Sequence, residues 1–137
     1  MNNYIKTQFP SEEVNEGLAR GIAAFFIMPL DPSVEAAEDV KTAVSEAVTN
    51  AIIHGYRESE GVVEMELTLA DRQLTVVVKD NGTGIEDIEK ARTPMFTTRP
   101  EEERSGMGFT IMESFMDELT VDSAPGMGTT VIMKKHL

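Results

Sequence analysis

Apolar and polar residues alternate with a period of two in parts of this chain, which is typical of half-buried β-strands. Such alternation covers residues 4–9. Further β-rich runs cover residues 62–69, 74–79, 119–122 and 129–133. A short polar connection, residues 70–72, separates the second run from the third, so these two runs are predicted to pair as an antiparallel hairpin.

Longer segments repeat their apolar residues at helical spacing. A first helix is predicted to begin at Ser11, a residue type suited to capping, and to end just before Pro29. A second helix is predicted to open at residues 31–33 and to run to His54, with Gly55 directly after its C-terminus. One apolar stripe of this second helix is formed by Val40, Ala43, Val44, Ala47, Val48 and Ala51.

A polar segment at about residues 92–105 contains two prolines and a charge cluster. A connection of this length inside a compact domain indicates either a disordered stretch or a functional lid. A short acidic helix is predicted before it, at residues 85–91, and another helix after it, at residues 109–116. This order of elements predicts an α/β fold of the α+β two-layer type, with one layer of helices on one mixed, mainly antiparallel sheet.

Composition limits the possible functions. The chain has 137 residues with 41% hydrophobic residues, which predicts a single domain over residues 1–137 with a real core. No apolar run is long enough to cross a membrane, no signal peptide is evident and cysteine is absent, so a cytoplasmic protein without a membrane segment is expected. The formal net charge of −12 disfavours direct contact with nucleic acid. It indicates either a solubilising surface or a partner with a basic face.

Three polar residues of the second predicted helix are candidates for chemistry. Glu46, Asn50 and His54 are spaced i, i+4 and i+8, so they lie along one side of the helix at the margin of its apolar stripe. Each also has an ordinary explanation, as a solvated carboxylate, a surface amide and a histidine at a helix C-terminus. At the wall of a pocket, however, the glutamate could accept a proton and the asparagine oxygen could bind a hard cation.

Three glycine-containing elements follow: residues 80–84 after a predicted strand, residues 106–108 before a helix, and residues 126–130 between the last two strands. Each alone is typical of a turn. Considered together, they suggest a ligand site. Asp80 is an acceptor suited to an exocyclic amine such as that of adenine, and Gly82 and Gly84 would let the backbone approach a flat ligand. Free amides at the start of the helix after residue 108 would favour phosphate.

In this order the motifs resemble the N, G1, G2 and G3 boxes of the GHKL ATPase superfamily, which includes DNA gyrase and the histidine kinases and has the Bergerat α/β sandwich fold. The matching series is Glu46-x-x-x-Asn50-x-x-x-His54-Gly55, Asp80-x-Gly82-x-Gly84, Gly106-x-Gly108 and Gly128-Thr129-Thr130. Residues 95–98, Met-Phe-Thr-Thr, resemble the F box before the lid. The chain length and the lack of a phosphoacceptor hairpin or transducer domain make it similar to the small anti-sigma-factor serine kinases.

The resemblance implies roles for individual residues. Glu46 matches the general base, Asn50 the Mg²⁺ ligand and Asp80 the adenine anchor. Arg104, which none of the boxes fixes, is a second catalytic candidate as a lid cation at the β- and γ-phosphates. The remaining positions expected to bind ATP or ADP are His54, Gly82, Gly84, Thr97, Thr98, Ser105, Gly106, Met107, Gly108 and Thr130.

The implied function has two parts. The chain would sequester a sporulation sigma factor in an ATP-dependent manner, and it would transfer the γ-phosphate of ATP to a serine of a STAS-type anti-anti-sigma protein. A homodimer is also implied. One alternative is a nucleotide-dependent binding switch without significant phosphotransfer, which would not need Glu46 as a base. A plain acidic binding module is the other alternative, and the joint pattern of motifs counts against it.

Overall fold

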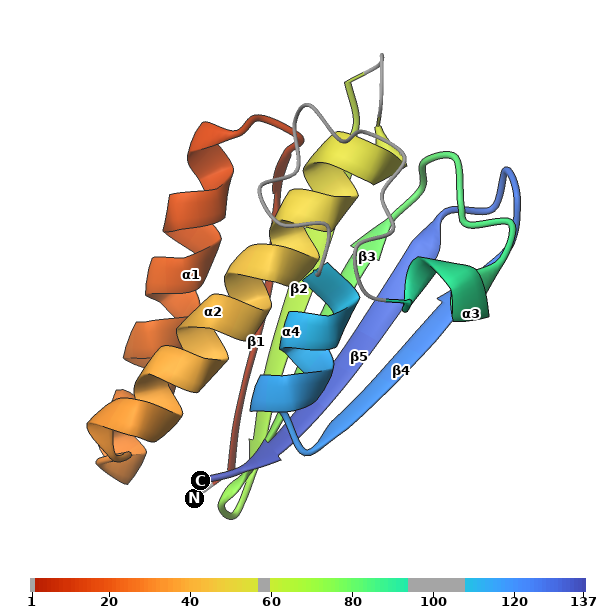
Figure 1. The fold of residues 1–137 in the computed structure, drawn as a ribbon. Helices are drawn as coiled ribbons and strands as arrows, with labels where there is room; N and C mark the ends of the chain where they lie inside the picture. The colour runs from red at the N-terminus through yellow and green to blue at the C-terminus, as the bar shows by residue number, and fades with distance from the viewer. Residues whose placement is uncertain (1, 57–59, 94–107) are drawn as a thin grey trace.

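A computed structural model describes residues 2–56, 60–93 and 108–137, and its core is a five-stranded sheet in the order β1-β2-β3-β5-β4 (Figure 1). The strands are β1 (Asn2–Pro10), β2 (Val62–Ala70), β3 (Gln73–Asp80), β4 (Glu118–Ser123) and β5 (Thr129–His136). The β2–β3 hairpin is confirmed, and it turns through Asp71, whose φ is 57°.

The expectation of a mixed sheet is wrong for the described residues, because every pair of neighbouring strands is antiparallel. The cause is the position of β5. β4 runs parallel to β3, but the β4–β5 hairpin places β5 between them. An antiparallel neighbour therefore stands on each side of β5.

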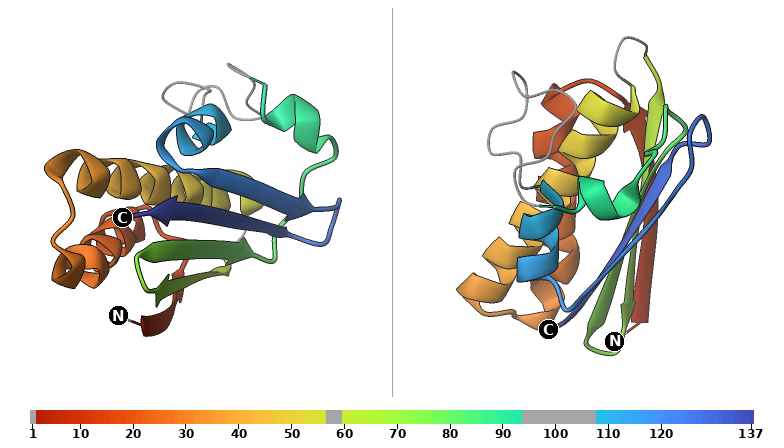
Figure 2. Two further views of the ribbon diagram at one scale, coloured as in Figure 1. Left: turned by 90° about the horizontal axis from the view of Figure 1, so that it is seen from below. Right: turned by 45° about the vertical axis from the view of Figure 1, so that its right-hand side comes forward.

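Three helices, α1 (Val14–Ile27), α2 (Val34–Asn50) and α4 (Gly108–Phe115), cover one face of the sheet, with α2 between the other two (Figures 1 and 2). Shorter pieces are a 3₁₀ turn (Met28–Leu30), a π-helical segment (Ala51–Gly55) and α3 (Ile88–Ala91). None of the helices within the described ranges combines the length and apolar character needed to cross a membrane. The expected two-layer α/β arrangement is confirmed.

The core lies between the helices and the sheet. Alternate strand residues are buried on the covered face, and these include Val63, Met65, Leu67, Leu69, Leu74, Val76, Val78, Val131 and Met133. The α2 stripe packs against them with Val40, Ala43, Val44, Ala47 and Val48. The residues between these positions on the strands are polar or half-exposed, as expected for an antiparallel sheet with one open face.

The two predicted helix starts had different outcomes. Ser33 caps α2, because its hydroxyl accepts a hydrogen bond from the Ala36 amide at 3.0 Å. Ser11 does not cap α1, which begins at Val14 after a residue without a capping side chain. The Ser11 hydroxyl instead accepts a hydrogen bond from the Gly61 amide at 3.0 Å, and the Ser11 amide donates to the Gly61 carbonyl at 2.9 Å. Ser11 therefore continues the contact between β1 and β2.

Candidate functional site

The second helix changes character where the site begins. It is α-helical to Asn50 and continues as a π-helical segment from Ala51 to Gly55. Such segments have i→i+5 hydrogen bonding and often mark functional sites. This segment brings His54 and Gly55 beside the end of β3, where a Cβ atom on Gly55 would overlap the carboxyl group of Asp80.

A cavity of about 590 Å³ lies between the end of α2, the ends of β3 and β5, α3 and the start of α4. Its volume falls within the range of small-molecule sites. Its apolar walls come from Ala47, Ala51, Val78, Ile85, Phe109 and Val131. Its polar lining includes Asn50, His54, Asp80, Thr83 and Thr129, and the charged residues Glu86, Asp87 and Lys90 also line it. An apolar pocket with a few convergent polar groups suits a flat ligand that carries polar substituents.

Asp80 is the most deeply buried polar group of this cavity. It is the last residue of β3 and is 4% exposed. Burial raises the pKa of its carboxyl group, while hydrogen bonds from the backbone of Gly82 and Thr129 oppose that rise. The Gly82 amide donates to Asp80 Oδ1 at 2.9 Å. A buried carboxylate that lines a cavity can accept a hydrogen bond from an amine of a ligand, and that bond would offset part of its desolvation.

The glycines around Asp80 allow close contact between chain segments. A Cβ atom on Gly82 would overlap the carbonyl oxygen of Gly55, and one on Gly84 would overlap the carbonyl oxygen of Ala124. A Cβ atom on Gly128 would overlap the carbonyl oxygen of Asp80. We expected Gly82 and Gly84 to admit a ligand. Gly84 does line the cavity, but both residues are required first for the packing of the loop.

Hydrogen bonds tie the loop after Asp80 to both of its neighbours. The Thr83 amide donates to the Gly55 carbonyl at 2.9 Å, and the Thr83 hydroxyl donates to the His54 carbonyl at 3.1 Å. On the other side, the Gly126 amide donates to the Thr83 carbonyl at 2.7 Å. The Ile85 amide donates to the Ser123 hydroxyl at 2.8 Å. The wall of the cavity is therefore fixed to the π-helical segment after α2 and to the β4–β5 hairpin.

The structure brings several of the expected residues together. Asn50, His54, Asp80, Gly84 and Gly108 line the cavity. Glu46 is half-buried one turn before Asn50 on α2, outside the lining that the described residues form. The expected residues Thr97, Thr98, Arg104, Ser105, Gly106 and Met107 lie outside the described residues.

One expected residue, Thr130, lies on the open face of the sheet rather than on the face with the cavity. Thr130 pairs with Lys79, whose side chain is exposed, and Thr129 pairs with Asp80 and lines the cavity. The two-residue period of β5 shows which of the two threonines faces the cavity. Thr129 shares a face with Val131 and Met133, which are buried, so the two-residue alternation of β5 would have selected it. Lys90 and Phe109 were also missed, because they come from separate elements that meet only in the fold.

A magnesium ion would have few protein ligands here. Within residues 2–56, 60–93 and 108–137, no group of three or more histidine, cysteine or acidic side chains is arranged to hold a metal ion. Asn50, whose side chain carries an amide oxygen, lines the cavity. Mg²⁺ commonly binds through one or two protein ligands together with phosphates of the substrate. The residues therefore fit an ion that arrives with a nucleotide, rather than one held by the protein alone.

Comparison with known proteins agrees with this geometry. Residues 9–135 match the family described as histidine kinase-like ATPase domain. Proteins named anti-sigma F factor from Clostridium novyi and Bacillus subtilis are 54% and 53% identical to this chain. These matches cover 98% and 100% of this chain and 95% and 94% of the respective relatives.

The fold also matches a solved structure. The crystal structure of the RsbU and RsbW domains of Rv1364c from Mycobacterium tuberculosis aligns with a TM-score of 0.71 at 18% identity. The alignment covers 98% of this chain and 32% of that one, so this chain spans about a third of its length. At this identity the match supports the fold alone.

Proposed function

The chain belongs to the histidine kinase-like ATPase domain family and, within it, to the anti-sigma F factors, and from this premise we propose that it is an ATP-dependent anti-sigma factor and protein serine kinase. In this proposal it holds a sporulation sigma factor and phosphorylates a serine of a STAS-type anti-anti-sigma protein. The observation that carries the proposal is the buried Asp80 in a nucleotide-sized cavity.

The cavity suits an adenine nucleotide in the following way. Asp80 would accept a hydrogen bond from the exocyclic amine, and Val78, Val131 and Phe109 would contact the base. Gly108 begins α4, where free backbone amides and the helix dipole favour phosphate oxygens. Asn50 would hold Mg²⁺, which neutralises charge on the β- and γ-phosphates when bound. Each of these groups lines the same cavity.

For the transfer step, Glu46 is the proposed base. A serine of the partner would lose its hydroxyl proton to the Glu46 carboxylate, and its oxygen would form a bond to the γ-phosphorus as the bond to the β-phosphate oxygen breaks. The products are phosphoserine and ADP. Glu46 lies outside the described lining of the cavity, which suits a group that meets the incoming serine rather than the nucleotide.

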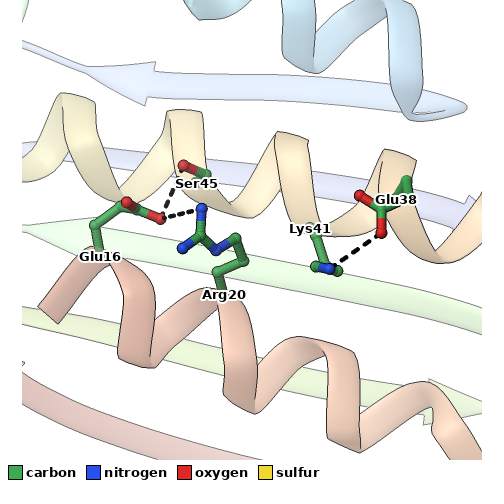
Figure 3. Close-up of polar contacts among 5 residues, drawn as sticks. All are labelled: Glu16, Arg20, Glu38, Lys41 and Ser45. Atoms are coloured by element: carbon green, nitrogen blue, oxygen red, sulfur yellow. Dashed lines mark hydrogen bonds and ion pairs between the residues drawn. The ribbon is translucent and has the colours of Figure 1, made fainter.

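Replacement of Glu46 by glutamine tests this role. Glu46→Gln should keep most of the nucleotide affinity and lose about 100-fold or more of the phosphotransfer rate, since glutamine cannot accept the proton. Glu38→Gln is the matched control, because Glu38 lies on the same helix, is 60% exposed and pairs with Lys41 at 3.1 Å (Figure 3). Mass spectrometry of the acceptor protein after incubation with Mg-ATP measures the rate. Transfer at the wild-type rate by Glu46→Gln would remove this residue from the chemistry.

The same assay separates the kinase from the alternative function. A nucleotide-dependent binding switch would bind Mg-ATP and change its affinity for the sigma factor, yet no phosphoserine would accumulate on the acceptor.

The acidic surface supports binding of partners that carry a basic patch. With a net charge of −12, the chain should hold the sigma factor less tightly as salt rises, because the Debye length falls from about 10 Å at 0.1 M to about 3 Å at 1 M. Unphosphorylated acceptor should displace the sigma factor, whereas phosphorylated acceptor should not, since its added charge of about −2 is repelled. A competition assay in which both forms displace it equally would exclude this switch.

A homodimer through α1 is part of the proposal. Val14, Leu18 and Phe25 follow one side of α1, and Met28 comes directly after its last residue; these four residues are 79%, 54%, 72% and 57% exposed. We call these four residues the α1 stripe. On the side that faces α2, the Ser45 hydroxyl donates to Glu16 Oε2 at 2.9 Å, and Arg20 lies 3.4 Å from the same oxygen (Figure 3). Exposed apolar area of this kind is typical of an association surface, and a second copy would cover it with the same stripe.

A further inference from the structure

We infer that Tyr56 is a positioning residue for recognition of the base: its hydroxyl fixes the backbone after Asp80 and thereby the direction of the Asp80 carboxylate. This inference rests on the proposed nucleotide site and deepens it. Tyr56 does not line the cavity within the described residues, so it would act through the loop rather than through the ligand.

The Tyr56 hydroxyl connects two segments that are distant in sequence. It accepts a hydrogen bond from the Asn81 amide at 2.6 Å and donates one to the Val62 carbonyl at 2.8 Å. Asn81 directly follows Asp80, and Val62 is the first residue of β2. The hydroxyl thus uses both its acceptor and its donor to join the start of β2 to the loop after β3.

The ring of Tyr56 has a fitted position. A Cβ atom on Gly61 would overlap the ring, so the absence of a side chain at Gly61 makes the space that the ring occupies. The half-buried ring therefore packs closely against Gly61, and the two hydrogen bonds of the hydroxyl hold its far end. Together these contacts define the direction of the hydrogen bond to Asn81.

Residues 55 and 56 together hold the two residues that flank Gly82. The Tyr56 hydroxyl binds the Asn81 amide, and the Gly55 carbonyl accepts the hydrogen bond of the Thr83 amide at 2.9 Å. Between them, the Gly82 amide donates to Asp80 Oδ1 at 2.9 Å. The orientation of that amide depends on both anchors, because neighbouring peptide planes share their connecting dihedrals. Loss of either anchor would leave the Gly82 amide less fixed, so the Asp80 carboxylate would depend more on its second hydrogen bond, from the Thr129 backbone, and would be directed less strictly.

This arrangement predicts a selective defect. Asp80 would recognise the exocyclic amine of adenine, whereas the phosphates would be bound by other elements of the cavity. Removal of the Tyr56 hydroxyl should therefore weaken binding only for nucleotides that carry the amine. A general loss of folding would weaken binding of all nucleotides alike.

The test compares two nucleotides on three proteins by calorimetry. The probes are Mg-ATP and the magnesium complex of purine riboside triphosphate, which lacks the exocyclic amine. Tyr56→Phe should bind Mg-ATP about three- to tenfold more weakly than the wild type, the scale of one hydrogen bond, and should bind the second nucleotide almost unchanged. Tyr4→Phe is the matched control, since Tyr4 is the other tyrosine of the chain and is 57% exposed on β1.

The possible outcomes are distinct. If Tyr56→Phe leaves both affinities unchanged or lowers both by the same factor, the ratio of the two affinities stays as in the wild type. That result would overturn the positioning role while leaving the nucleotide site in place. A wild-type protein that binds neither nucleotide would overturn the proposed function, and this inference with it.

Discussion

Two hollows of similar size differ in the chemistry of their walls. The cavity at the end of β3 measures about 590 Å³, and a hollow beside α1 measures about 500 Å³. The first gathers Asp80, Asn50 and His54 among apolar residues. The second is lined entirely by Ile5, Gly17, Leu18, Gly21, Ile22, Phe25 and Phe26. Volume alone therefore does not distinguish a ligand site from a protein surface.

The two hollows differ in whether the interactions that they offer a ligand have a direction. A buried acceptor such as Asp80 binds a ligand tightly only if the ligand places a hydrogen-bond donor at one position and in one direction. The binding free energy of an apolar surface depends mainly on the area that is covered, which favours a large partner. We therefore propose that the β3 cavity binds a nucleotide and that the α1 surface binds a second copy of the chain. The predictions below test that contrast.

The largest effect is expected from Gly82→Ala. Its added Cβ would overlap the Gly55 carbonyl oxygen, so the free energy of unfolding should fall by about 3 kcal/mol. Gly126→Ala is the control: Gly126 also lies in this region and has a φ of 75°, but a Cβ atom there meets nothing within 4 Å. Gly126→Ala should lower the free energy of unfolding by only about 1 kcal/mol, through backbone strain. Urea denaturation measures both, and equal losses would show that the close approach at Gly82 does not limit the site.

A substitution on the α1 surface should separate assembly from ligand binding. Phe25→Asp places a charge in the α1 stripe, where Phe25 is 72% exposed, and should weaken dimerisation by about 2 kcal/mol. Val34→Asp is the control, because Val34 is 82% exposed on α2, outside that stripe. Sedimentation gives the oligomeric state, and calorimetry should find nucleotide affinity unchanged in the monomer. A Phe25→Asp protein that remains dimeric would rule out this interface.

Asp80→Asn should have opposite effects on binding and on stability. Nucleotide affinity should weaken by roughly 1–3 kcal/mol, because the amide is a poorer acceptor than the carboxylate. The nucleotide-free protein should be no less stable, since asparagine keeps an acceptor for the Gly82 amide and removes the cost of a buried charge. Glu86→Gln, at an exposed residue of the same cavity, is the control. Unchanged affinity in Asp80→Asn would exclude Asp80 as the anchor.

The raised pKa of Asp80 predicts a smaller effect of pH. Burial holds the folded pKa above the ordinary value of 3.8, so the unfolded chain loses this proton before the folded protein does. The contribution of Asp80 to stability is therefore full below pH 3.8 and is lost as the pH rises through the folded pKa. Nucleotide affinity should rise over the same interval, because the carboxylate is the better acceptor. Comparison of wild type with Asp80→Asn isolates the dependence of stability on pH and the dependence of nucleotide affinity on pH. Identical pH profiles of the two proteins would contradict both effects.

Local patterns predicted the strands and several of the residues that line the cavity. The runs at residues 62–69 and 74–79 correspond to β2 and β3 within a residue or two, because alternation and burial agree along them. Asn50, His54 and Asp80 were found because helical spacing and a strand end lie within short stretches of sequence. These signals depend only on neighbours along the chain.

Other features depend on contacts that the chain order does not contain. The π-helical segment after Asn50 was predicted as ordinary helix, and its end is packed against Asp80, which lies on another element. The antiparallel order followed from the position of β5, a non-sequential neighbour of β3. Thr130 was expected from the family resemblance, whereas Thr129 lines the cavity, because a one-residue step along a strand moves a side chain to the other face.

The central claim is that the β3 cavity binds the nucleotide and the α1 surface does not. Two-dimensional amide spectra recorded during titration with a non-hydrolysable Mg-ATP analogue test it directly, because each amide reports its own surroundings. The largest shifts should fall on residues 80–85, Gly108 and Thr129, and those of Leu18 and Phe25 should stay unchanged. Saturating shifts on α1 without shifts around Asp80, or no shifts at all, would contradict the assignment of the site.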